Sequence, residues 1–309
     1  MNSSSLPSSL FSALSEDDAH AVIAGVDALS THHDAVHEAT GTRVRWRRFG
    51  PRDATSAPHA PNPPLVLLHG GHGSWMHWLR NVEALSAKHT LWVPDMPGFH
   101  DSDVPPLAVP GEAPLDPLLA ALGGTLDQLI GAGTPIDLAG FSFGGLTAAR
   151  FALRRGAIRR IALLGSGGHG TLRRLRVDMI NWRAAPDRAA EVAALRHNLA
   201  ALMLHDEAAI DALAFTIHDI SCHGTRYRSK EVSQGGGLED ALDTMDARGV
   251  PQLLLWGEFD VTADPRPLVA SLTAGHPLRE GVVVDGAGHW AQFERAEETN
   301  RALLRFFGA

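Results

Sequence analysis

Three polar residues in distant parts of the chain have the types and the order that a serine-based nucleophilic site requires. Ser142 is the central residue of Gly140-Phe-Ser-Phe-Gly144, which directly follows an apolar run at residues 136–139 and precedes a helical pattern. A G-x-S-x-G sequence between a strand and a helix predicts a sharp turn that lifts the serine hydroxyl above a sheet. A strained serine of this kind costs about 1–3 kcal/mol, which the surrounding packing must offset. We therefore predict that Ser142 is a nucleophile.

A serine hydroxyl is a weak nucleophile, so it needs a base, and the base needs a group that orients it. His289 lies just past an apolar run at residues 282–284, and Asp260 lies just past the preceding run, at residues 253–256. The chain order Ser142, Asp260, His289 is the order of nucleophile, acid and base in sites built at the ends of parallel strands. We predict that these three residues form a catalytic triad.

Other candidate groups receive no catalytic role from the sequence. Glu258 and Asp264 are rivals for the acid, and we interpret both as solvated carboxylates of a turn. Cys222 has no signature of a nucleophilic cysteine around it and is read as a buried small hydrophobe. The chain has 17 histidines, but no H-E-x-x-H or Cys/His framework, so we expect no metal site.

A glycine-rich sequence after the apolar run at residues 65–68 predicts an oxyanion hole. This sequence is His69-Gly-Gly-His-Gly73. The backbone N–H of Gly71 can pair with that of Phe143, and one such donor stabilises a transition state by about 3–4 kcal/mol. The rival interpretation, a phosphate-binding loop, is disfavoured because neither G-x-x-x-x-G-K-[ST] nor G-x-G-x-x-G is present.

Aromatic and histidine side chains close in sequence to these parts are expected to line an apolar substrate pocket. For any single tryptophan the alternative is ordinary core packing. The expected pocket residues are Gly70, His72, Trp75, His77, Phe141, Trp182 and Trp290.

Short apolar runs alternate with helical stretches along most of the chain, which predicts an α/β fold with a mostly parallel sheet. Continuous apolar runs fit strands that are buried on both faces. The predicted strands span residues 43–49, 65–68, 91–93, 136–139, 161–164, 253–256 and 282–284, and the clearest helices span 115–130, 146–154 and 296–307.

The remaining segments predict the domain organisation. Residues 171–248 have helical periodicity and no strand run, so we expect a helical cap or lid over the strand ends. Residues 1–40 are expected to be an N-terminal helical extension, with a capped helix that begins at 15–18 and continues through 19–29. Residues 41–170 and 249–309 form the expected core, in which 51–64 is a Pro- and Ala-rich loop.

Composition excludes several classes of partner. The chain of 309 residues carries 27 basic and 35 acidic side chains, a net charge of −8, which argues against nucleic acids and anionic membrane surfaces. No apolar run reaches the length of a spanning helix, and the first 14 residues lack a secretory signal. A single cysteine suits a reducing cytoplasm. We expect a cytoplasmic protein with a small-molecule substrate, and a homo-oligomer stays open.

On these motifs the chain resembles an α/β-hydrolase from about Arg43 to its C-terminus. The sequence Asp95-Met-Pro-Gly-Phe99 matches the turn after the fourth strand of that family, where we interpret Asp95 as structural. The resemblance implies a central sheet flanked by helices, a helical lid inserted between strands six and seven, and no cofactor.

Two stretches are similar to the meta-cleavage-product hydrolases, which cleave C–C bonds in vinylogous 1,5-diketones. These stretches are Gly288-His-Trp-Ala-Gln-Phe-Glu294 and Gly165-Ser-Gly-Gly-His-Gly170. The chain also departs from that subfamily. Phe141 stands where an Asn usually precedes the nucleophile, His77 replaces a second pocket Asn, and no counterpart of the lid Arg is identified.

Three functions therefore remain open at this stage. The first is a hydrolase of a small to medium, largely apolar carboxylic ester, and the second is a C–C hydrolase of an aromatic ring-cleavage product. The third, from another class, is a small-ligand receptor that keeps the triad and hardly turns over. Turnover that depends on Ser142 separates the third function from the other two.

Overall fold

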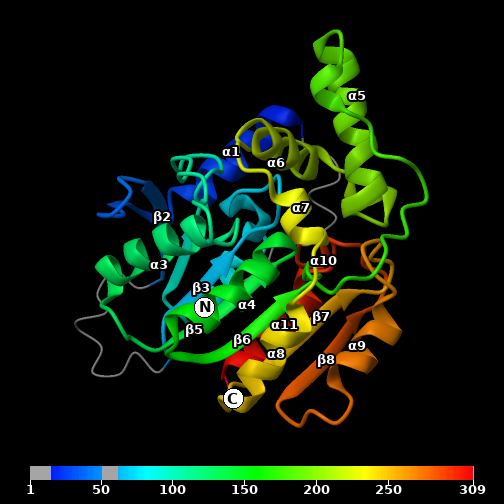
Figure 1. Ribbon diagram of the computed structural model, residues 1–309. Coiled ribbons are helices and arrows are strands. Elements are labelled where there is room, and N and C mark those ends of the chain that lie inside the picture. The colour runs from blue at the N-terminus through cyan, green and yellow to red at the C-terminus, as the bar shows by residue number, and fades with distance from the viewer. Residues whose placement is uncertain (1–14, 51–61, 309) are drawn as a thin grey trace, which may run out of the picture.

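The computed structural model describes residues 15–50 and 62–308, and its centre is an eight-stranded sheet (Figure 1). The strand order is β1-β2-β4-β3-β5-β6-β7-β8, and pairing is parallel except for β1 with β2 and β2 with β4. The expected features of residues 1–14 and most of the loop 51–64 lie outside the described residues. The strands are β1 (Thr31–Val36), β2 (Arg43–Phe49), β3 (Leu65–Leu68), β4 (Leu91–Pro94), β5 (Ile136–Phe141), β6 (Ile158–Leu164), β7 (Gln252–Gly257) and β8 (Arg279–Val284).

The sequence predicted seven of these strands and missed β1. Its sequence, Thr-His-His-Asp-Ala-Val, is mostly polar, and only Ala35 is buried, because β1 is an edge strand that pairs with β2 alone. The N-terminal extension expected over residues 1–40 therefore contains a strand as well as a helix. Helix α1 (Glu16–Asp27) begins with the expected capping box between Ser15 and Asp18, and ends two residues before the predicted end.

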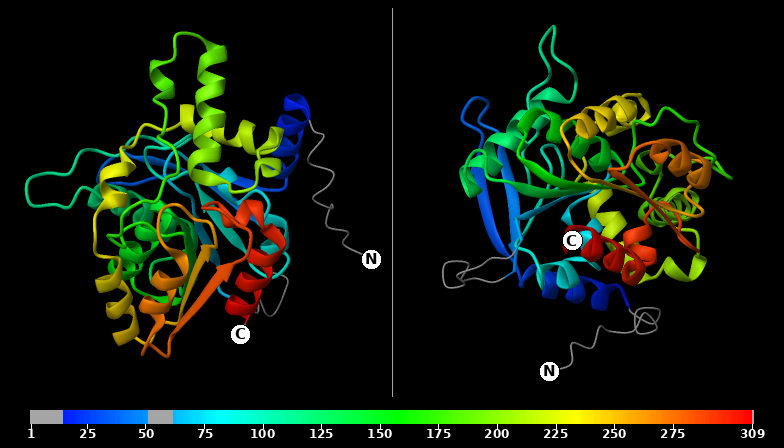
Figure 2. Two further views of the ribbon diagram at one scale, coloured as in Figure 1. Left: turned by 90° about the vertical axis from the view of Figure 1, so that its right-hand side faces the viewer. Right: turned by 90° about the horizontal axis from the view of Figure 1, so that it is seen from below.

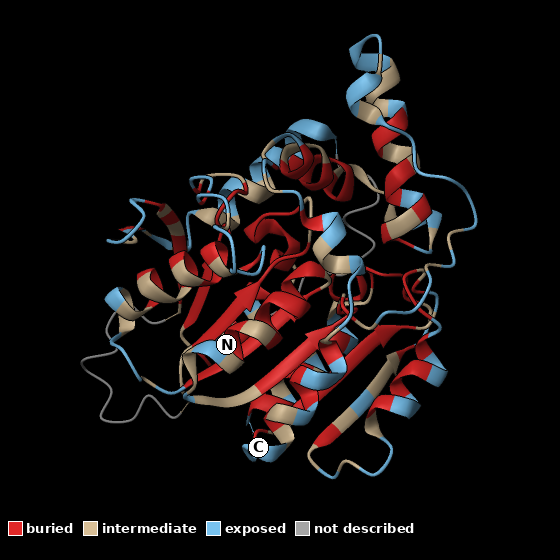
Figure 3. Ribbon diagram, in the orientation of Figure 1, coloured by how far each residue is buried: buried red, intermediate tan, exposed pale blue. Residues whose placement is uncertain are grey.

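Alternating residues of the central strands enter two separate cores, one on each face of the sheet. In β3, Val66 and Leu68 belong to one core, and Leu65 and Leu67 belong to the other. This burial on both faces is why the β3 run contains no polar residue (Figure 3). The first core contains side chains of α3 (Asp116–Ile130), α4 (Phe143–Arg155), α8 (Leu238–Ala247) and α9 (Pro265–Thr273), and the second contains those of α2 (Val82–Ser86), α10 (Ala291–Glu294) and α11 (Ala296–Gly308).

The long segment between β6 and β7 is helical, as predicted, but its last helix packs in the core layer, where α8 contacts α4. The other helices lie beyond the C-terminal ends of the strands, and α5 projects away from the sheet (Figures 1 and 2). Helix α1 packs against α6. The described helices include none with the length and apolar character needed to cross a bilayer. The helical elements of this segment are α5 (Arg188–Asn198), η4 (Leu199–Met203), α6 (Ala212–His223) and α7 (Ser229–Gln234), with short 3-10 turns at Trp182–Ala184 and Glu207–Ala209.

A buried arginine of β2 connects three parts of the fold. Arg47 is 3% exposed, and its guanidinium contacts Asp27 at 2.6 Å, Asp95 at 2.8 Å and Asp101 at 2.9 Å. Asp95 is fully buried, and its other carboxylate oxygen accepts the backbone N–H of Trp75 at 2.9 Å. Arg47 therefore ties the end of α1 to the turn after β4, and Asp95 has the structural role that the sequence indicated.

We predict that Arg47→Met lowers the free energy of unfolding by about 3 kcal/mol, because it leaves the buried Asp95 carboxylate without its guanidinium. Urea unfolding measures the effect. Arg45→Met, on the same strand, is the matched control, because Asp34, the partner of Arg45, is 43% exposed. Its expected cost is about 0–1 kcal/mol. Equal losses in the two variants would contradict a structural role of the buried network.

Candidate active site

The turn between β5 and α4 holds Ser142 in a strained backbone conformation. Its φ is 55° and its ψ is −117°, a region that non-glycine residues rarely adopt. The turn is tight because Gly140 and Gly144 approach other backbone atoms so closely that an added Cβ would collide with them. Helix α4 begins at Phe143, three residues earlier than the pattern predicted, since two glycines weaken the helical signal at its start.

The three predicted residues form one hydrogen-bonded line. The Nε2 atom of His289 lies 2.9 Å from the Ser142 Oγ, and its Nδ1 atom lies 2.8 Å from the Asp260 Oδ2. His289 follows β8 and Asp260 follows β7, so neighbouring parallel strands deliver both side chains to the same edge of the sheet as Ser142. Asp260 and His289 are 3% and 4% exposed, and burial strengthens such hydrogen bonds.

Thr262, to which the sequence did not point, holds the other oxygen of Asp260. The Thr262 backbone N–H and hydroxyl donate to the Asp260 Oδ1 at 2.8 and 2.6 Å. Burial acts to raise the pKa of Asp260, but the charge of His289 and the hydrogen bonds from His289 and Thr262 outweigh it and lower that pKa. Asp260 is thus held as a carboxylate. The feature of the sequence that could have indicated this role is a threonine two residues after Asp260.

The two rival carboxylates are occupied elsewhere. Glu258 pairs with Arg266 at 2.9 Å and accepts the N–H of Gly286, and Asp264 pairs with Arg174 at 2.7 Å. Neither makes a hydrogen bond to the imidazole of His289 in the described structure, so the geometry favours Asp260 as its partner.

The two predicted oxyanion donors lie near one another, since a Cβ added at Gly71 would be 3.6 Å from the Phe143 Cβ. Within the described residues, the amides of Gly71 and Phe143 have no hydrogen-bond acceptor, and Phe143 is the first residue of α4, where such free donors are expected. The Gly70 amide is not available, because it donates to the Nδ1 of His77 at 3.2 Å. The amides of Gly71 and Phe143 are therefore free to act as the predicted pair, whereas the Gly70 amide has a structural hydrogen bond.

The cavity that opens on Ser142 is small and polar. We call it the Ser142 cavity. Its floor is formed by Ser142, Thr262 and His289, and its wall by the segment 165–173 and by Ser233 and Gln234 of α7. Its volume is about 30 Å³, room for about two or three water molecules. A substrate of several heavy atoms needs more room than this cavity offers.

None of the seven residues expected to line the pocket lines this cavity, and most of them pack in the core instead. Phe141, which ends β5, is fully buried, with its ring 4.9 Å from that of His289. Trp290 donates to the His77 carbonyl at 3.0 Å and stacks on Phe293. Phe141 and Trp290, which are next to catalytic residues in sequence, point into the core, so they pack beneath the site and do not face a substrate. The seven residues are Gly70, His72, Trp75, His77, Phe141, Trp182 and Trp290.

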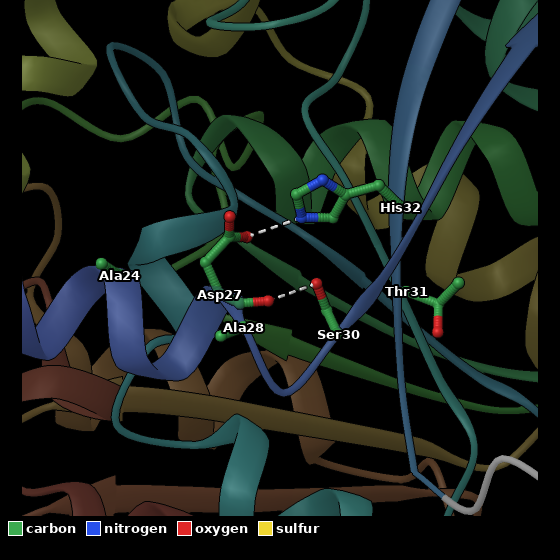
Figure 4. Close-up of a pocket in the computed structure, with 6 residues that line it drawn as sticks. All are labelled: Ala24, Asp27, Ala28, Ser30, Thr31 and His32. Atoms are coloured by element: carbon green, nitrogen blue, oxygen red, sulfur yellow. Dashed lines mark hydrogen bonds and ion pairs between the residues drawn. The ribbon is translucent and has the colours of Figure 1, made fainter.

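Other polar clusters of the described residues offer no comparable chemistry. The clusters Asp95–His100–Asp101 and Asp243–Asp246–His276 have the spacing of metal ligands, but each surrounds an arginine guanidinium, of Arg47 and of Arg279 respectively. A surface depression between α1 and β1 is lined by Asp27, Ser30 and His32, among others, and its polar groups bond to one another (Figure 4).

Comparison with known proteins agrees with this fold. The family model described as alpha/beta hydrolase fold matches residues 63–296. A 2-hydroxy-6-oxononadienedioate/2-hydroxy-6-oxononatrienedioate hydrolase of Burkholderia vietnamiensis is 27% identical over 296 residues, covering 92% of this chain and 98% of that protein. The dihydrolipoyllysine-residue acetyltransferase component of the acetoin cleaving system of Pseudomonas putida is 28% identical over 87% of this chain and 68% of that protein. The crystal structure of an esterase from Rhodococcus sp. superposes with a TM-score of 0.70 at 20% identity, covering 90% of this chain and 98% of that one.

The backbone at Gly165 passes so close to the triad that a side chain there would press against it. Its φ is +50°, and an added Cβ would lie 3.1 Å from both the Asp260 Oδ2 and the His289 Nδ1. We predict that Gly165→Ala slows covalent labelling of Ser142 by a fluorophosphonate about 100-fold, because small misplacements of reacting groups have effects of that order. Gly156→Ala, at a φ of +67° with open space around it, is the control for backbone strain alone. Equal labelling rates in Gly165→Ala and in the wild type would show that the triad tolerates a side chain at this position.

Thr262 generates a prediction about pH dependence. Thr262→Val removes one donor from the Asp260 carboxylate, which then attracts the imidazole proton more strongly. We expect fluorophosphonate labelling to slow by about 10-fold, as for a lost hydrogen bond to a charged group. The acidic limb of its pH profile should move to higher pH. Thr262→Ser keeps the hydroxyl and should restore both. If the pH profile of labelling were the same in Thr262→Val and in the wild type, Thr262 would contribute only packing.

Proposed function

The chain belongs to the α/β-hydrolase fold family, and we propose that it is a cofactor-free serine hydrolase that attacks a carbonyl carbon of a small to medium-sized substrate. The observation that carries the proposal is the hydrogen-bonded line from Ser142 through His289 to Asp260. Nucleophile, base and orienting acid are the three roles that this chemistry needs, and the geometry supplies one residue for each.

In the proposed mechanism, the Ser142 Oγ attacks the carbonyl carbon while His289 Nε2 takes its proton. Asp260 fixes the imidazole so that Nε2 faces Ser142 and stabilises the imidazolium that forms. The oxyanion accepts hydrogen bonds from the amides of Gly71 and Phe143. His289 then returns the proton to the leaving group, and a water molecule activated by His289 releases the acid product.

A carboxylic ester is the first candidate for the bond that is cleaved, since the triad and two amides suffice for acyl transfer. A C–C bond of a ring-cleavage product is the second candidate, favoured by the name of the Burkholderia relative.

The experiment that separates the candidates compares two kinds of substrate on the purified protein. Short 4-nitrophenyl esters report ester hydrolysis, and a 2-hydroxy-6-oxo-dienoate reports C–C cleavage by loss of its absorbance. Fast turnover of one kind identifies the bond. Labelling by a fluorophosphonate with turnover of neither would leave a ligand receptor with a preserved triad and would reject the proposed function.

We predict that Ser142→Ala lowers kcat at least about 1000-fold and that Asp260→Asn causes a loss of similar order, because the triad acts as a unit. Glu258→Gln is the control for Asp260, since Glu258 is paired with Arg266 away from the imidazole. Steady-state kinetics with the best substrate measure all three variants. If Glu258→Gln caused the large loss and Asp260→Asn did not, the acid would be assigned to the wrong residue.

A further inference from the structure

The hydroxyl of Ser229, the first residue of α7, lies against the pair of amides proposed to bind the oxyanion. A Cβ added at Gly71 would lie 2.5 Å from the Ser229 Oγ and 3.6 Å from the Phe143 Cβ. Helix α7 also contacts α4, whose first residue is Phe143 (Figure 1). The Ser229 hydroxyl and the residues of both amide donors therefore surround the same small space.

This space is kept open by Gly71 for a steric reason. The φ of Gly71 is outside the positive range that favours glycine, unlike that of Gly165, so its backbone would accept a side chain. The atom nearest to an added Cβ is the Ser229 Oγ. The hydroxyl of Ser229 thus occupies the place that a side chain of residue 71 would take.

The Ser229 hydroxyl has no hydrogen-bond partner in the described chain, although Ser229 is only 3% exposed. Its backbone is satisfied, because its N–H donates to the Tyr227 carbonyl at 3.1 Å and its carbonyl accepts the Ser233 hydroxyl at 2.8 Å. Buried hydroxyls are usually paired, since an unpaired one has lost its hydrogen bonds to water. An unpaired O–H beside two amides that also lack an acceptor indicates a site for a negatively charged oxygen.

Hydrogen bonds on both sides of Ser229 hold it in this position. The backbone amides of residues 226 and 227 donate to the Gly98 carbonyl at 2.9 and 3.0 Å, which ties the chain before α7 to the turn after β4. The Ser233 carbonyl accepts the Gly168 amide at 2.9 Å, which ties α7 to the segment after β6. A donor that is fixed in advance stabilises a developing charge without a cost of reorganisation.

We propose that Ser229 is a catalytic residue whose hydroxyl is a third donor to the oxyanion, beside the amides of Gly71 and Phe143. When the Ser142 Oγ adds to the carbonyl carbon, the carbonyl oxygen gains the negative charge and accepts the Ser229 O–H. No bond at Ser229 breaks, because its proton stays on the hydroxyl and the proton of Ser142 passes to His289. This role rests on the proposed hydrolase function, and it makes the oxyanion site complete only with α7 in place.

The first test is Ser229→Ala, which removes the hydroxyl and keeps a small side chain. We expect kcat on the best substrate to fall about 100-fold, as for one lost oxyanion donor. KM should change little, because the charge develops only in the transition state. The control is Ser221→Ala, which removes a buried hydroxyl of α6 that is bonded to the Ser74 hydroxyl at 2.9 Å, and it should keep the wild-type kcat. A wild-type kcat in Ser229→Ala would overturn the proposal.

The second test uses the contact between Gly71 and Ser229. Gly71→Ala keeps the amide N–H but places a methyl group 2.5 Å from the Ser229 hydroxyl, which has to move away. We expect Gly71→Ala, Ser229→Ala and the double variant to lose kcat by similar factors, because each lacks the third donor. If Ser229 only filled space, the double variant would recover the wild-type kcat, since the two changes compensate in volume, and the proposal would be rejected. The unfolding temperature of each variant shows that a lower kcat does not come from loss of the fold.

Labelling by a fluorophosphonate separates failure of this proposal from failure of the hydrolase function. The Ser142 Oγ bonds to phosphorus, fluoride leaves, and the phosphoryl oxygen takes the place of the oxyanion. Labelling that slows about 100-fold in Ser229→Ala supports the third donor, even where no substrate is turned over and the hydrolase function fails. Equal labelling rates in the wild type and in Ser229→Ala, together with turnover by both, reject the third donor and keep the hydrolase function.

Discussion

The positive φ of Ser142 is the constraint on which the rest of the site depends. A residue in this region costs about 1–3 kcal/mol and persists only where its neighbours enforce it. Here the Ser142 N–H donates to the Leu164 carbonyl of β6 at 2.8 Å, and its own carbonyl accepts the amides of Gly145 and Gly167 at 2.9 Å. Hydrogen bonds from β6 and from the segment after it therefore offset the strain. Gly167 also lines the Ser142 cavity, so its hydrogen bond fixes both the nucleophile and the cavity wall.

The imidazole opposite Ser142 is fixed in a complementary way. The Nδ1–H of His289 donates a hydrogen bond to Asp260, which holds one edge of the ring. The ring of Phe141, the residue just before the nucleophile, lies 4.9 Å away. Glu294 holds the loop that carries His289, because it accepts the Gly288 amide at 2.6 Å and the amides of His205 and Asp206. One buried carboxylate thus joins the loop of the base to the segment after η4.

The sequence predicted what depends on strand order and local turn chemistry. The G-x-S-x-G turn and the order Ser142, Asp260, His289 gave the line that the geometry displays, because parallel strands place their ends together. It missed Thr262, whose role depends on how an irregular loop folds, and no periodicity encodes that. The expected aromatic wall failed for a related reason. Nearness in sequence does not fix side-chain direction, and Trp290 turns into the core beside His289.

The wall of the Ser142 cavity is formed by residues 165–173 and by the end of α7, and the first of these segments is attached unevenly along its length. Its start is fixed, because the amides of Gly165 and Gly167 donate to the carbonyls of Leu255 and Ser142 at 2.8 and 2.9 Å. Residues 169–181 have no helix or strand, and their apolar side chains Leu172 and Val177 are 88% and 49% exposed. Because displacement of residues 169–181 uncovers little buried apolar surface, it costs less free energy than movement of the segment that begins at Gly165. The cavity can therefore widen without disturbing the hydrogen bonds that hold the nucleophile.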